Sequence, residues 1–144
     1  MKAETNEVCL LQHLYQNARQ GEETLCVLKK RLPEGALRAS VDAQIRGYRS
    51  LRQKVAGHLR QKGLEPQEAG LMTKTMSQMM TRLHAMQDPS PTHAAEMIIQ
   101  GSTMGIVGAT EDLNQYQGGG QPRKLADEVI HFEQENIERM KAFL

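Results

Sequence analysis

Carboxylate and imidazole side chains at helical spacing are the groups in this chain that could do metal chemistry. Di-iron sites in helical bundles take one Glu from each of two helices and a Glu-x-x-His pair from each of the other two. One literal pair is present, Glu128 with His131, but it lies one residue out of step with the apolar seam that contains Val129. A second pair, Glu133 with Asn136, lies closer to that seam and carries an amide where imidazole would stand.

The remaining ligands are too few for two metal ions. In an antiparallel hairpin closed by the glycine loop at 118–120, the residue opposite Glu133 is about Gly105, which offers no ligand. Across the loop near residue 33, the residue opposite Glu22 is about Gln44. Glu96 lies near the start of its helix and therefore at a different level of the bundle. We therefore expect no cofactor. If iron or manganese binds, the candidate ligands are Glu22, Glu96, Glu133 and His131.

The two cysteines, Cys9 and Cys26, are expected to be free thiols. On one helix they would lie about 25 Å apart, too far for a disulfide. A Cys–His nucleophile pair needs a third group that orients the base, and the sequence shows none beside either cysteine. Free thiols, a polar start after Met1 and no apolar stretch of roughly 20 residues predict a soluble, cytoplasmic protein without a membrane span.

Helices must position these groups, and the prolines mark where the helices end. Proline disrupts a helix interior, and none of the five prolines interrupts a run with apolar steps of three and four. We predict a single domain, 1–144, with long helices at about 4–32, 34–62, 92–117 and 122–143 and a crossover helix at about 66–86. Short links make two antiparallel hairpins and a long link joins them. The predicted fold class is therefore all-α, a ferritin-like antiparallel four-helix bundle.

Amides and glycines occupy seam positions where leucine is expected. Glycine costs about 1 kcal/mol relative to alanine inside a helix, so its presence indicates either close helix approach or a pocket. The pocket candidates are Gln44, Tyr48, Gly101, Met104, Gly105 and Asn136.

Methionines gather in the crossover segment. Methionine fills irregular gaps and also suits adaptable contact surfaces. The segment therefore caps the bundle or contacts a partner or a second copy. The interface candidates are Met72, Met76, Met79, Met80 and Leu83, and we expect a homodimer.

Composition disfavours several classes of partner. The chain has 18 Lys and Arg against 17 Asp and Glu, whereas nucleic-acid binding usually needs a basic surplus. Aromatic residues make up 3%, too few for a base-stacking surface. We expect no nucleic-acid partner.

Three stretches carry a family resemblance: LYQNARQG at 14–21, HAAEMIIQGSTMGI at 93–106 and ENIERMK at 135–141. Through them the chain resembles an uncharacterised group of small bacterial ferritin-like proteins, commonest in Gram-positive anaerobes. The resemblance covers essentially the whole chain and implies ferritin relatives that have lost their iron ligands. The last helix also resembles the fourth helix of rubrerythrin-like proteins, with Asn136 where a His ligand would stand. That difference argues against peroxidase or ferroxidase activity.

Three functions are consistent with these observations. The leading hypothesis is a non-enzymatic structural, interaction or binding protein, whose protein partner the sequence does not identify. The first alternative is a degenerate di-metal redox or metal-storage protein. The second is a small-molecule binder that uses the bundle interior.

Overall fold

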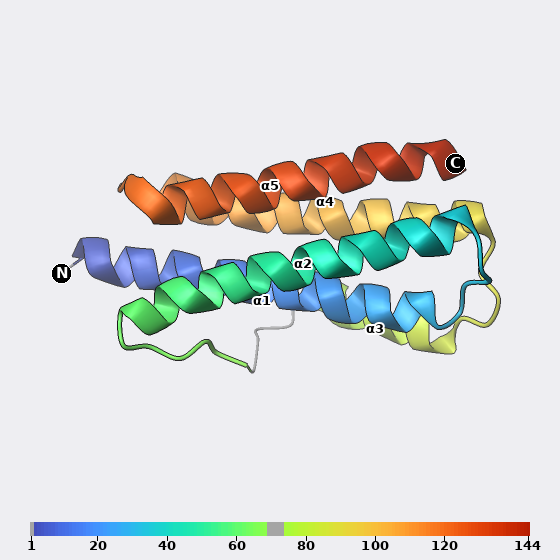
Figure 1. Ribbon diagram of the computed structural model, residues 1–144, viewed down its shortest axis with the longest axis horizontal. Helices are drawn as coiled ribbons and strands as arrows, with labels where there is room; N and C mark the ends of the chain where they lie inside the picture. Colours follow the sequence, from blue (N-terminus) through green and yellow to red (C-terminus); the bar gives the residue numbers. More distant parts are fainter. Residues whose placement is uncertain (1, 69–73) are drawn as a thin grey trace.

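The chain folds as a bundle of long helices (Figure 1). The computed structural model describes residues 2–68 and 74–144, and the side chains of 6–68 and 77–144. The described residues form helices only: α1 (Lys2–Lys29), α2 (Ala36–Gln61), α3 (Lys74–Ala85), α4 (Pro91–Gln115), α5 (Gly120–Met140) and a short 3₁₀ helix, Lys141–Phe143. The predicted all-α class is confirmed.

Two antiparallel hairpins lie side by side along the molecule. One contains α1 and α2 and the other α4 and α5, and the termini lie at opposite ends (Figure 1). Because α2 ends at the opposite end of the bundle from the start of α4, the chain between them must run the length of the bundle. That connection contains α3, which packs against α1.

Local signals set the helix ends. The Ser90 side chain accepts a hydrogen bond from the His93 backbone N–H at 3.1 Å, and Pro91 occupies the first helical position of α4, where its missing N–H costs nothing. Gly63, with φ of 75°, follows α2 in the left-handed conformation that ends many helices. Within the predicted crossover helix at 66–86, residues 66–68 are not helical and the helix that the structure describes is α3, Lys74–Ala85.

The core consists of two apolar clusters, one toward each end of the bundle. One contains Leu10, Leu14 and Leu125, and the other contains Leu28 and Met97. Between them lies a layer of buried polar side chains, among them Gln44, Glu133 and Asn136, each 1% exposed or less. This layer is the level at which the sequence places amides and a carboxylate in the seam.

Two glycines let aromatic rings enter the interior. A Cβ added to Gly21 would lie 2.5 Å from the Tyr48 ring, and one added to Gly47 would overlap the Phe132 ring. The Tyr48 and Phe132 rings meet edge to face, with centroids 4.9 Å apart. Close approach therefore explains Gly21 and Gly47, one of the two explanations that the sequence leaves open for its helical glycines.

Replacement of Gly47 tests this packing. Gly47→Ala is expected to lower the free energy of unfolding by about 1–3 kcal/mol, because the added methyl group collides with Phe132. Gly57→Ala on the same helix is the matched control. Nothing lies within 4 Å of a Cβ at that position, so the change should raise stability by about 0.5–1 kcal/mol. Urea unfolding of both variants measures the difference, and an equal effect of the two substitutions would contradict the packing.

Candidate functional site

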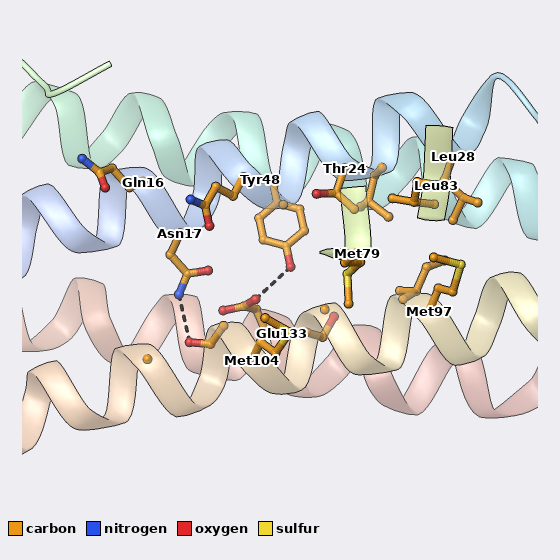
Figure 2. Close-up of a pocket in the computed structure, with 18 of the residues that line it drawn as sticks. Gln16, Asn17, Thr24, Leu28, Tyr48, Met79, Leu83, Met97, Met104 and Glu133 are labelled. Atoms are coloured by element: carbon orange, nitrogen blue, oxygen red, sulfur yellow. Dashed lines mark hydrogen bonds between the residues drawn. The ribbon is translucent and has the colours of Figure 1, made fainter. Parts of the chain in front are cut away.

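A cavity of about 280 Å³ lies between α1 and α4. On α1 it extends from His13 to Leu28, and on α4 from Met97 to Asp112. Tyr48 of α2, Glu133 of α5, and Met79 and Leu83 of α3 complete its walls (Figure 2).

The cavity has one apolar end. Leu28, Met79, Leu83 and Met97 gather there, at the end of the bundle that α3 covers (Figure 2). On the α4 side the wall contains Gly101, where a Cβ would lie 3.7 Å from the Met79 sulfur. The space at this end therefore suits hydrocarbon.

The Glu133 carboxyl group is the polar centre of the cavity. It is 1% exposed, and its Oε2 accepts a hydrogen bond from the Tyr48 hydroxyl at 2.9 Å. Its Oε1 has no hydrogen-bond partner among the described residues. A Cβ on Gly105 would overlap the carboxyl group, so α4 can pass at this level only with glycine.

Burial makes this carboxyl group a weak acid. Loss of hydration raises the pKa of Glu133 to about 8, against the smaller opposing effects of Tyr48 and Asn17. The pKa of the Tyr48 hydroxyl is raised well above its usual value, first by burial and then by the negative charge of Glu133. At neutral pH, Glu133 is therefore mostly protonated. Since Oε2 accepts from Tyr48, Oε1 is the atom free to carry the proton.

Amide side chains of α1 lie beside this centre. The Asn17 Nδ2 donates to the Gly105 carbonyl at 2.9 Å and thereby joins α1 to α4 across the cavity (Figure 2). Gln16 and Gln20 also line the wall. They lie three and seven residues after His13, so helical spacing from that residue could have identified them.

Four of the six predicted pocket residues line the cavity: Tyr48, Gly101, Met104 and Gly105. Gln44 and Asn136 are buried in the same polar layer but outside the lining. The Gln44 amide is 3.5 Å from the Ser40 hydroxyl, and the Asn136 Oδ1 accepts from Arg139 at 3.3 Å. Within the described chain, the Gln44 Oε1 and the Asn136 Nδ2 have no partner.

Three of the four residues named as metal ligands lie outside the cavity lining. The Glu22 carboxylate binds Arg49 and Arg52, each at 2.8 Å, and both guanidinium groups lower its pKa against the effect of burial. Glu96 is exposed, and the exposed His131 pairs with Glu135. Only Glu133 faces the interior.

The donor set does not fit a di-iron centre. Among the described side chains, those of residues 6–68 and 77–144, no group of three or more His, Cys, Asp or Glu converges. The neighbours of Glu133, namely Tyr48, Asn17 and Gly105, replace the further carboxylates and imidazoles that two iron ions require.

The interface candidates differ in how far the structure exposes their side chains. Met79 and Leu83 are 2% and 1% exposed and face the bundle, so they are not available to a second copy. Met80 is half-buried, and its sulfur accepts a hydrogen bond from Thr24 at 3.5 Å. Met72 lies outside the described residues, as does the side chain of Met76.

Sequence reasoning missed the polar group at the other end of the cavity. The His13 Nδ1 lies 2.9 Å from the Asp112 Oδ1, and its Nε2 lies 3.7 Å from the Cys9 sulfur. The expectation that no third group orients a Cys–His pair is therefore wrong. Asp112 follows His13 by 99 residues, and only the packing of α4 on α1 brings them together.

A bilayer-crossing segment is also not found: across the described residues, no helix combines the length and apolar character that a membrane span requires.

Comparison with known proteins identifies the fold. The sequence matches no known protein family and no curated protein. Two solved structures are similar over nearly the whole chain. A conserved hypothetical protein from Mycobacterium tuberculosis has 14% identity and a TM-score of 0.65, with 99% of this chain and 96% of that one covered. A dodecameric thioferritin, the bacterioferritin-related protein from Bacteroides fragilis, has 13% identity and a TM-score of 0.66, with 98% and 84% covered. The fold is ferritin-like.

The buried acid makes stability depend on pH. Glu133 in the folded chain keeps its proton up to about pH 8, whereas an unfolded chain loses it near 4.5. The folded state binds more protons in that interval, so this residue lowers stability progressively as the pH rises through it. Glu133→Gln mimics the protonated group. We expect it to be more stable than the parent at pH 8, with the difference vanishing near pH 4.

Urea unfolding at several pH values measures this effect. The exposed Glu111 of α4 supplies the control, because Glu111→Gln should leave the pH dependence unchanged. A Glu133→Gln protein whose stability runs parallel to that of the parent at all pH values would contradict a buried, protonated carboxyl group.

Proposed function

We propose that this protein is a non-enzymatic binding protein that holds a small, uncharged, amphipathic molecule inside its bundle. One observation carries the proposal: an apolar cavity of about 280 Å³ contains a buried carboxyl group whose Oε1 has no partner among the described side chains. Cavities of roughly this size, apolar with a few fixed polar groups, are typical of small-molecule sites.

The energetics of the empty site favour a ligand. A buried polar atom without a hydrogen bond costs about 1–3 kcal/mol, and a ligand that bonds to Oε1 would remove that cost. Three glycines, Gly101, Gly105 and Gly108, line the α4 wall, each at about 1 kcal/mol relative to alanine. Gly105 makes room for Glu133, whereas a Cβ on Gly108 would meet nothing within 4 Å. Space rather than close helix contact accounts for Gly108.

The charges around the cavity select an uncharged ligand. Among the described lining residues, the acidic and basic side chains besides Tyr48 are Glu133 and the paired His13 and Asp112. A carboxylate ligand would gain no unpaired cation, and an ammonium ligand would have to ionise Glu133 in an apolar setting. The oxygen of a hydroxyl or amide can instead accept a hydrogen bond from the protonated Oε1, while the hydrocarbon of the ligand lies against Leu28, Met79 and Met97.

Thermal unfolding with four probes of one chain length tests this assignment: octanol, octanamide, octanoate and octylamine. We expect the two neutral probes to raise the melting temperature and the two charged ones to have less effect, since ligands that bind only the folded state stabilise it. Gly101→Leu fills the apolar end and should remove the shift. Gly57→Leu, on an open face of α2, should keep it.

Two outcomes would overturn the proposal. One is the absence of any shift with the neutral probes at concentrations near their solubility. The other is an equal shift in the Gly101→Leu and Gly57→Leu proteins, which would place binding outside the cavity.

The metal alternative is the weaker one. Protein purified without chelator and then exposed to ferrous iron under anaerobic conditions should bind no stoichiometric iron, because Glu133 stands among amides and glycine rather than further carboxylates. Elemental analysis after gel filtration measures this. Two iron or manganese ions per chain, lost in Glu133→Ala, would establish the di-metal function instead.

Self-association stays part of the proposal. The similar protein from Bacteroides fragilis is a dodecamer, which supports an oligomer and does not favour a dimer. Among the described side chains, α3 offers the half-buried Met80 to such a contact, because Met79 and Leu83 are used inside the bundle.

A further inference from the structure

The His13 imidazole connects a thiol to a carboxylate. Its Nδ1 lies 2.9 Å from the Asp112 Oδ1, so Nδ1 carries the hydrogen and donates it to the carboxylate. The Nε2 lone pair is then directed at the Cys9 sulfur, 3.7 Å away. This is the order of nucleophile, base and orienting group found in covalent catalysis.

The three residues lie at the end of the cavity. His13 and Asp112 line its wall, and Cys9 precedes His13 by one helical turn on the same face of α1. The thiol is exposed, so a molecule lying in the cavity could extend to it. Independently, the unpartnered Oε1 of Glu133, in a side chain 1% exposed, indicates that the same cavity takes a ligand.

At rest, Cys9 is a thiol and not a thiolate. Partial burial, followed by the negative charge of Asp112, raises the pKa of Cys9 above its usual value. Asp112 is the charged group of α4 that faces it, while Glu7 of α1 is bound to Lys62 of α2 at 2.8 Å. Because the thiolate fraction at neutral pH is small, acyl transfer depends on transfer of the thiol proton to the His13 Nε2, whereas a strong alkylating agent reacts with the thiolate that is present.

The surroundings limit the electrophile. Cys9 and Asp112 lie inside long helices, where the backbone N–H groups are already bonded within the helix. Amides and esters with poor leaving groups depend on free donors that stabilise an oxyanion. A thioester depends on such donors less, because a thiolate is a good leaving group. Exchange of an acyl group between two thiols also involves no oxidation or reduction.

We propose that Cys9 accepts an acyl group from a thioester whose acyl chain lies in the cavity, with His13 as the base and Asp112 as the positioning residue. The Cys9 sulfur attacks the carbonyl carbon, and its proton moves to the His13 Nε2. A new carbon–sulfur bond forms as the old one breaks, and the proton passes to the departing thiolate. The products are S-acyl-Cys9 and a free thiol. The inference rests on the cavity of the proposed function and adds a covalent step at its end.

Intact-protein mass spectrometry with the octanoyl thioester of N-acetylcysteamine tests the step. One adduct per chain is expected, and peptide mapping should place it on Cys9. Cys9→Ser should remove it and Cys26→Ser should keep it. Acylation of Cys26 at a rate equal to that of Cys9 would overturn the proposal, because Cys26 has no His partner among the described contacts.

Asp112→Asn separates a base mechanism from simple thiol exposure. Loss of the carboxylate charge lowers the pKa of Cys9, so alkylation by iodoacetamide at pH 7 should become faster. Acyl transfer should become slower by about 10-fold or more, because His13 loses its orientation. His13→Gln should also slow acyl transfer. If alkylation and acyl transfer change in the same direction in Asp112→Asn, His13 does not act as a base that Asp112 positions.

The role of the cavity is tested through chain length. Gly108→Leu narrows the cavity between Gly105 and Asp112. It should slow transfer from the octanoyl thioester but not from the acetyl thioester. Gly57→Leu is the control. Transfer from the octanoyl thioester unaffected by Gly108→Leu would overturn the placement of the chain. If octanamide raises the melting temperature but Cys9 is not acylated, this inference fails and the proposed function stands. If Cys9 is acylated but octanamide does not bind, the proposed function alone is contradicted.

Discussion

The buried Glu133 carboxyl group is the constraint on which the interior of this bundle depends. It lies between two apolar clusters, accepts a hydrogen bond from Tyr48, and leaves no room for a side chain on Gly105. Because no cation contacts it among the described residues, burial keeps it protonated at neutral pH. The carboxyl group in this polar layer is therefore mostly uncharged at neutral pH.

The glycines of the helices serve two different purposes. Gly21 and Gly47 accept the rings of Tyr48 and Phe132, so they allow close packing. Gly101 and Gly108 instead leave room along α4, and α3 closes the apolar end with Met79 and Leu83. At the level of Glu133 this bundle carries amides and glycine, and the glycines leave volume beside the carboxyl group.

The ends of the cavity differ in chemistry. Hydrocarbon surrounds one end, and the other carries the His13–Asp112 pair with the Cys9 thiol next to it. The same face of α1 presents Cys9, His13 and Asn17 in successive turns. The structure thus places a thiol, an imidazole–carboxylate pair and an amide in series along one helix.

The sequence by itself determined the helices and their order, because prolines, glycines and apolar steps of three and four are local signals. It also identified Glu133 opposite Gly105, since the residues of an antiparallel hairpin that meet lie at equal distances from its loop. Contacts between the two hairpins were decided only by tertiary structure. The pairing of His13 with Asp112 and the inward packing of Met79 and Leu83 depend on how α1, α3 and α4 meet, and no local pattern encodes that distance.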